Sequence, residues 1–138
     1  MSSFSAALRT KLLSYTTISN VIGQRMYTDI LATEALMPAV LFYCVDTNRD
    51  HYLGGLLKSA HAQYSIDCYS NTRSGASALS KVIRECGIDS FRGTVDGFEF
   101  CGAEFISSDN HQYDQPTDGN RVVRYYTSFD VIFHYKEP

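Results

Sequence analysis

The stretch VIGQRMY, residues 21–27, lies between a short helix pattern and an apolar strand pattern. Before it, apolar residues repeat at the spacing of one helix face, which predicts a helix over 3–15. This face consists of Phe4, Leu8, Leu12 and Tyr15. The predicted order is a helix, then an elbow that contains a glycine and an arginine, then a strand. The rest of the chain is interpreted from this order.

The elbow itself has three parts. Gly23 can adopt the left-handed conformation that ends a helix, so a second helical turn is predicted over 19–22. Residues 24–29 fit a short edge strand. Pro38 fits the first position of a strand but not its middle. The apolar run 39–45 that follows it is typical of a strand with both faces covered.

The middle of the chain predicts a strand and a second helix. Residues 60–69 alternate between apolar and polar side chains, as a half-buried strand does. Residues 70–72 supply candidates for the helix N-cap. Gly87 stands where a C-terminal glycine cap is expected. The predicted buried stripe of this helix consists of Ala76, Leu79, Val82, Ile83 and Cys86.

The last third predicts strands. Phe98 and Phe100 share one parity while Ala103 and Phe105 share the other, so a bulge at Gly102 would bring all four to one side. The alternation over 121–135 is the clearest strand pattern in the chain. Fifteen extended residues would span roughly 50 Å, which predicts that the strand bends, bulges or projects.

Two polar segments are interpreted as long loops, 46–59 and 107–120. They carry His51 and His111. The element order is therefore α-β-β-α-β-β. It predicts an α+β fold with a mainly antiparallel sheet and two helices packed on one face, in a single domain over 1–138.

Two helices cover only one face of such a sheet. The other face would carry Tyr69, Tyr126, Ile132 and one side of 39–45. Because exposed apolar or aromatic patches mark protein interfaces, an oligomer is expected.

Composition excludes several classes of protein. The net charge of −3 argues against nonspecific nucleic-acid binding, which needs clustered Lys and Arg. No apolar run approaches the roughly 20 residues of a membrane span. The first residues lack the basic and apolar regions of a secretory signal, so folding in the cytoplasm is expected.

The four cysteines, Cys44, Cys68, Cys86 and Cys101, are widely spaced and contain no C-x-x-C pair. We expect all four to be small buried hydrophobic residues, with no disulfide framework and no metal site.

Catalytic patterns are weak. No histidine has a second His or Cys at metal-ligand spacing, and no phosphate-binding or nucleophile motif occurs, so neither a cofactor nor catalysis is expected. The alternative hypothesis is an enzyme or small-ligand protein with a site near Asp67, Arg124, Asp130 and His134. The simpler interpretation places both aspartates on the solvent side or pairs them with Arg124.

Four segments resemble the phage tail completion family, also called tail terminators or head-tail joining proteins. The helix and VIGQRMY resemble its "hydrophobic-Gly-x-Arg-hydrophobic-Tyr" elbow, and residues 37–40 resemble its proline-led strand. Residues 63–69 and the helix after them resemble a later strand and helix of the family. Residues 121–135 resemble its terminal strand. The two long loops depart from its pattern.

The resemblance implies a structural virion protein. Such proteins form a homo-hexameric ring that caps the head-proximal end of the tail tube, stops tube polymerisation and docks the head. The implied partners are the tail tube protein and the head-tail connector, with DNA passing through the lumen without specific binding. Assembly would take place in the host cytoplasm. Another tail or connector subunit remains an alternative.

Arg25 is a candidate interface anchor, and a surface arginine packed on Tyr27 is an equally good interpretation. The loop 46–59 is too hydrophobic around its glycines for an idle solvated loop, so it is predicted to contact a neighbouring subunit, the tail tube or the connector. The interface candidates are Arg25, Tyr52, Leu53, Leu56, Leu57 and Tyr126.

Overall fold

The computed structural model describes residues 4–29, 37–52, 55–88, 92–95, 97–105, 110–114 and 124–136. The helices in this part of the chain are α1 (Phe4–Leu13), α2 (Thr16–Ile22) and α3 (Arg73–Val82), which continues as the π-helical segment η1 (Ile83–Ile88). The strands are β1 (Met26–Thr28), β2 (Ala39–Tyr52), β3 (Gly55–Ser70), β4 (Gly93–Val95), β5 (Phe98–Phe105), β6 (Asn110–Asp114) and β7 (Arg124–Lys136).

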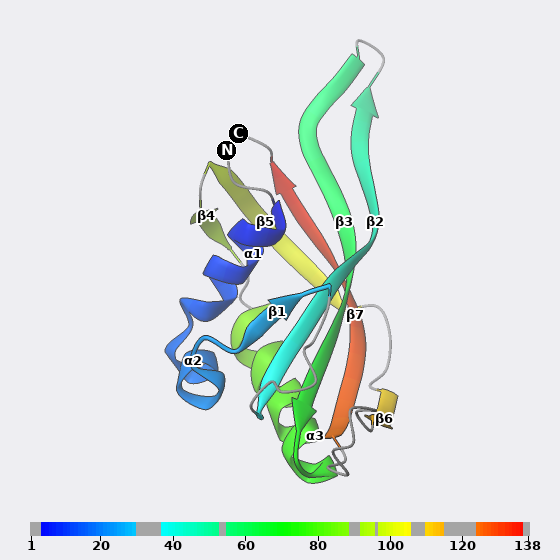
Figure 1. Ribbon diagram of the computed structural model, residues 1–138. Helices are drawn as coiled ribbons and strands as arrows, with labels where there is room; N and C mark the ends of the chain where they lie inside the picture. Colours follow the sequence, from blue (N-terminus) through cyan, green and yellow to red (C-terminus); the bar gives the residue numbers. More distant parts are fainter. Residues whose placement is uncertain are drawn as a thin grey trace.

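The strands form one sheet in the order β1-β2-β3-β7-β5-β4, and β6 pairs with β7 beside this path. β1 pairs with β2 in parallel, whereas the other neighbouring strands pair antiparallel. Figure 1 shows the helices gathered on one side of the curled sheet, with β2 and β3 running the length of the molecule. The predicted α+β class with a mainly antiparallel sheet is confirmed.

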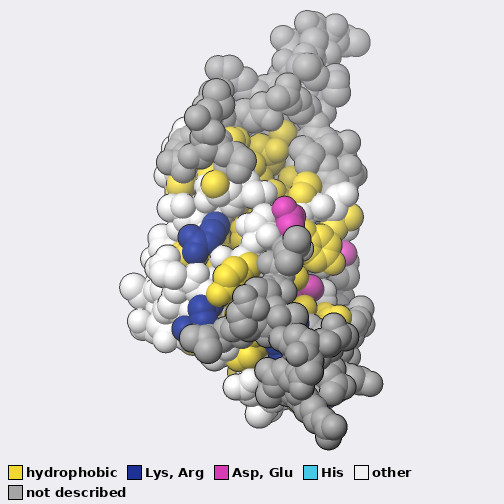
Figure 2. All heavy atoms as spheres, in the orientation of Figure 1, with side chains coloured by type: hydrophobic (Ala, Val, Ile, Leu, Met, Phe, Trp, Pro, Cys, Tyr) yellow, Lys and Arg dark blue, Asp and Glu magenta, His cyan; other side chains and the backbone are white. Residues whose placement is uncertain are grey.

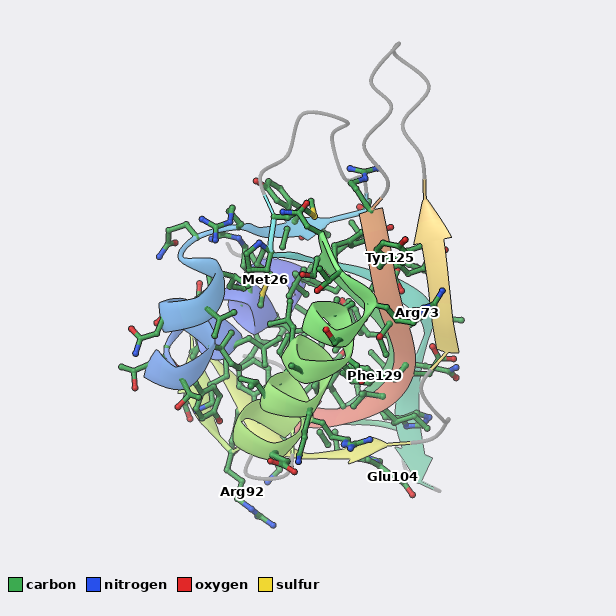
Figure 3. All side chains as sticks on the ribbon, turned by 90° about the horizontal axis from the view of Figure 1, so that it is seen from below. Met26, Arg73, Arg92, Glu104, Tyr125 and Phe129 are labelled. Atoms are coloured by element: carbon green, nitrogen blue, oxygen red, sulfur yellow. The ribbon has the colours of Figure 1, made fainter. Side chains whose placement is uncertain are left out.

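The core lies between the helices and the inner face of the sheet. Its sheet side is built from alternate residues of β2, β3 and β7, because side chains two apart share a face. In Figure 3, Phe129 of β7 lies behind α3, and Met26 of β1 lies near the α1–α2 side of the same interior. The largest fully buried side chains are Phe42, Phe100, Phe129, Phe133, Leu8, Leu12, Ile18, Ile22, Met26, Ile66 and Ile83.

The second long helix begins where the sequence predicts. The Thr72 hydroxyl accepts a hydrogen bond from the Gly75 N–H at 3.0 Å, which satisfies one of the first donors of α3. Ala76, Leu79 and Ile83 are buried as expected. The expected end is wrong, because the backbone continues in π-helical turns through Gly87 to Ile88.

The predicted order α-β-β-α-β-β was too simple. Residues 16–22 form a helix of their own, so three α-helices rather than two pack on the inner face. The segment 46–59 is not a loop, since β2 and β3 pair as far as Tyr52 and Gly55. Part of 107–120 is the strand β6. His51 and His111 therefore lie in strands.

The terminal strand and its neighbour agree with the pattern. β7 extends over 13 residues, and Figure 3 shows it curving around the core, which is how so long a strand fits the domain. The register of β5 against β7 shifts between Phe100 and Gly102. This bulge confirms the one predicted, because Phe98, Phe100 and Ala103 all pack on the core, and the side chain of Phe105 lies outside the described part.

The cysteine prediction holds only in part. Cys68 is fully buried, but Cys44 is exposed and Cys101 is partly exposed. The side chain of Cys86 lies outside the described part. Cys44, Cys68 and Cys101 carry thiols and form no disulfide bond. Each of the two exposed or partly exposed cysteines lies at a register shift, Cys44 beside the one between β2 and β3 and Cys101 within the one between β5 and β7.

Candidate assembly surfaces

The elbow is held by two arginines. The Arg25 Nε donates to the Pro38 carbonyl at 2.8 Å, and its Nη2 donates to the Val21 carbonyl in the last turn of α2 at 3.3 Å. Arg9 of α1 donates from Nε and Nη2 to the Met26 and Gln24 carbonyls, both at 2.9 Å. Positive charge at the last carbonyls of a helix, such as that of Val21, is favourable.

These contacts revise the interpretation of Arg25. Its guanidinium links the end of α2 to the start of β2, so it organises the fold at the elbow. Its role as an interface anchor stays a prediction. Sequence reasoning missed Arg9, whose position directly after the core residue Leu8 was the available signal, although spacing alone does not show which carbonyls it reaches.

The distal parts of β2 and β3 form a hairpin, here called the arm and defined as residues 46–59. Strand pairing continues to its tip, where Tyr52 lies opposite Gly55. Figure 1 shows the arm projecting well past the helices and β1. Of the predicted contact residues, Tyr52, Leu56 and Leu57 lie in its strands, and their side chains and Leu53 are outside the described part.

The outer face of the sheet, away from the helices, carries aromatic residues at one end. The rings of Tyr69 and Tyr126 lie 4.7 Å apart in adjacent strands, and the Arg124 guanidinium lies 5.5 Å from the Tyr69 ring centroid. Tyr69 and Arg124 are buried, while Tyr126 is half-buried. Cation–π and aromatic contacts of this kind hold side chains in fixed positions.

The centre of the outer face is polar. The hydroxyls of Ser65 and Ser128 lie 3.4 Å apart, and the Gln63 amide donates to an Asp130 carboxylate oxygen at 3.4 Å. Asp67 is only 6% exposed. Burial raises the pKa of Asp67, a hydrogen bond from Ser128 lowers it, and the charge of Asp130 raises it further. Both aspartates lie on the outer side of the sheet, as the simpler interpretation has it, but Asp67 is buried there rather than exposed.

The four residues of the alternative site do not converge. Arg124 and His134 lie ten positions apart on β7, roughly 33 Å along an extended strand. The His134 Nε2 lies 3.8 Å from a Glu104 carboxylate oxygen and its ring is 5.9 Å from that of His61, at the end of β7 away from Asp67. Within the described residues, no three His, Cys, Asp or Glu side chains are placed to hold a metal ion.

Exposed apolar side chains lie where the arm leaves the body. Tyr43 is 37% exposed and Val45 is 53% exposed, just beyond the three β2 residues that β1 covers. The sequence placed both in a covered central strand. The available signal was the shift from apolar to polar residues after position 45, which marks where β2 leaves the core.

Charge is unevenly placed on the face that Figure 2 shows. Basic side chains, in dark blue, lie over the region of α1, α2 and β1, and acidic ones, in magenta, lie over the strands to the right. No helix among the described residues has the length and apolar character to cross a membrane.

The comparisons with known proteins agree with this architecture. None of the curated proteins matches the chain. Among solved structures, a chain of the particle titled "Virion of native gene transfer agent (GTA) particle" has a TM-score of 0.66 at 11% identity, and the match covers 96% of this chain and 95% of that chain. At this identity the likeness shows a shared fold. The family model "Tail completion protein gp17" matches residues 6–127. Since that match spans most of the chain, this protein belongs to the tail completion protein gp17 family and is a structural protein of a phage tail.

Proposed function

We propose that this protein forms a homo-hexameric ring on the head-proximal end of a phage tail tube. The ring stops further addition of tube subunits and presents a docking surface to the head-tail connector. The family match over residues 6–127 is the observation that carries this proposal. The shared fold with a chain of a gene transfer agent virion supports it.

The shape of the molecule suits a ring subunit. A projecting arm and a compact body are two different surfaces, and a cyclic ring joins unlike surfaces of successive subunits. Loops and hairpins held on a rigid scaffold are common sites of partner recognition. The arm is therefore the proposed contact with the neighbouring subunit, the tail tube or the connector, through Tyr52, Leu53, Leu56 and Leu57.

The charge of the chain suits passage of DNA. Six copies would carry a formal charge of −18, six times −3. An acidic lumen repels the phosphate backbone, so DNA passes without being retained. The proposed role is thus structural, without catalysis, and its place is the virion, after assembly in the host cytoplasm.

Electron microscopy of tails tests the role directly. Tails made without this protein are expected to vary in length and to lack heads, and adding the purified protein should give ends with a ring that accept heads. Tails of normal length that join heads in its absence would contradict the proposal. A protein found along the whole tube or within the connector would identify another tail subunit instead.

Shortening the arm tests its part in assembly. Replacing residues 50–58 by a tight turn leaves every residue of the described core in place, so the body should stay folded with an unchanged circular dichroism spectrum. Ring formation or head joining should be lost. Normal particles from this variant would show that the arm is only a connection between strands.

A further inference from the structure

Two long strands continue past the short strands that pair with their outer edges. β1 pairs with β2 only at Val40, Leu41 and Phe42, and β4 pairs with β5 only at Phe98, Glu99 and Phe100. Within the described residues, no strand pairs with 43–52 on the side away from β3, nor with 101–105 on the side away from β7. We call these the β2 edge and the β5 edge.

The backbone directions on the β2 edge follow from the bonds to β1. The Val40 N–H donates to the Arg25 carbonyl, and the Phe42 carbonyl accepts from the Asp29 N–H, both bonds on the side away from β3. Backbone groups alternate in direction along a strand, so Cys44 also directs its N–H and C=O to the open side.

A bulge resets this alternation. The register against β3 shifts between Cys44 and Asp46, so one extra residue is inserted and Asp46, opposite Gln63, directs its backbone groups to β3. Thr47 and Arg49 then direct theirs outward. The β2 edge therefore offers hydrogen-bonding groups along the arm, which can template another strand.

The sheet order places the two edges at opposite ends. β2 is second from one end of the path and β5 is second from the other. A contact between them in successive copies is therefore head-to-tail, which is the kind of contact that closes a ring. A partner protein that paired with one edge would leave the other uncovered, whereas a second copy covers both.

From these two edges we infer that the β2 edge of one copy pairs with the β5 edge of the next, so that the sheet continues from subunit to subunit. This inference rests on the proposed ring and specifies its contact. Residues 46–49 lie opposite 60–63, which also pair with β7, so that only the part of the arm nearer the tip is a two-stranded ribbon. Such a ribbon is marginally stable alone, and a third strand along the β2 edge would stabilise it. The contact would also cover Tyr43 and Val45, which are exposed at the root of the β2 edge.

The chain carries a thiol on each edge. Cys44 lies on the β2 edge and is exposed, and Cys101 lies at the start of the β5 edge and is partly exposed. Cross-linking with a short bifunctional maleimide therefore reports the contact, both on concentrated purified protein and on protein bound to tail ends. Wild-type protein should give a ladder of cross-linked species up to the closed ring.

Two variants distinguish head-to-tail pairing from a symmetric pair. Cys44→Ser alone and Cys101→Ser alone should give no cross-link, because each lacks one of the two thiols. Their mixture should give dimers and nothing larger. Dimers from either variant alone would mean that like edges meet and would overturn the inference. The double variant Cys44→Ser/Cys101→Ser controls for the other thiols, and a wild-type ladder from it would also overturn the inference.

A backbone substitution gives a second readout. Thr47→Pro removes an N–H that points to the open side and leaves the pairing with β3 in place, since proline is tolerated on the outer side of an edge strand. We expect it to abolish assembly, while Thr47→Val, which keeps the N–H, assembles normally. Normal assembly of Thr47→Pro would overturn the inference.

The two proposals fail in different ways. Wild-type protein that caps tails but gives no Cys44–Cys101 cross-link leaves the ring function standing and overturns the edge contact. A wild-type ladder in solution from protein that never binds tails supports the edge contact and contradicts the ring function.

Discussion

Strands β3 and β7 carry two different faces on one backbone. Their inner face is apolar and sealed, with Tyr64, Ile66, Phe129 and Phe133 buried against the helices. Their outer face alternates with it residue by residue and is polar at its centre, with Ser65 and Asp130 as opposite partners. The inner face resembles the interior of any stable domain, and the outer face resembles a surface with an aromatic end.

The difference corrects one reason for expecting an oligomer. The outer face was predicted to be too apolar for a monomer, but its centre consists of serine, glutamine and aspartate side chains. Exposed apolar residues lie on β2 at Tyr43, which is opposite Ser65 on the same outer face, and at Val45, where the arm begins, and Val21 is exposed on α2. The comparison therefore moves the expected contact from the polar centre of the outer face, on β3 and β7, to its β2 side, where the β2 edge is open.

The difference between the two faces is tested most directly by substituting neighbouring residues that lie on opposite faces. Phe133→Ala empties a fully buried site among aromatic rings, so the free energy of unfolding should fall by about 3–5 kcal/mol. Ile132→Ala, on the half-buried outer face, should cost roughly half of that or less. Urea unfolding of both variants measures the difference. Equal losses would show that the outer face is packed as tightly as the inner one.

A smaller effect is expected at the hydroxyl group of Tyr64, on the inner face. The Tyr64 hydroxyl lies 2.7 Å from the Ser5 Oγ and so fastens the start of α1 to β3. Tyr64→Phe keeps the ring and loses this hydrogen bond, so the free energy of unfolding should fall by about 1 kcal/mol at pH 7. Ser5→Ala, which removes the other partner, should cost a similar amount.

The pH dependence sharpens this test. Burial raises the pKa of Tyr64 to about 12, from an ordinary value of 10.0. The folded state therefore holds the proton after the unfolded chain has released it, so this contribution to stability is complete below pH 10 and is lost between about pH 10 and 12. Tyr64→Phe should lack that part of the alkaline loss. A constant difference between the two proteins over this range would contradict the assignment.

Sequence patterns predicted the features that depend on a single helix or strand. The 3.6-residue spacing in α1 and α3, the Thr72 cap and the bulge beside Gly102 each follow from local chemistry, and each was confirmed. The polar residues of 46–59 wrongly predicted a loop, because strands that pair outside the core need no alternation of apolar residues. Two paired strands satisfy their own backbone groups wherever they project.

The candidate surfaces were harder to predict than the fold. Cys44 and Cys101 follow apolar residues in strand patterns, and apolar neighbours along a strand do not show which side chains the core covers. Arg25 stood out because it is an isolated cation between two apolar segments, but the carbonyls that it reaches are fixed by the tertiary fold. Which strand edges stay open depends on the sheet order, which no local pattern contains.

The smallest effect has the opposite sign and concerns the outer face. Because burial raises the pKa of Asp67 above its ordinary 3.8, the folded state favours the neutral carboxyl group. The stability that this provides is complete below pH 3.8 and is lost as the pH rises through the pKa in the folded state.

Asp67→Asn keeps the shape and an oxygen that accepts from Ser128, and it carries no charge. The variant should therefore be slightly more stable than wild type at pH 7, with a gain that shrinks as the pH falls toward 3.8. Urea unfolding at several pH values between these limits measures it. A variant that is less stable by the same amount at every pH would show that the Asp67 carboxylate holds the outer face together through its hydrogen bonds, and that the outer face depends on its polar contacts as the inner face depends on packing.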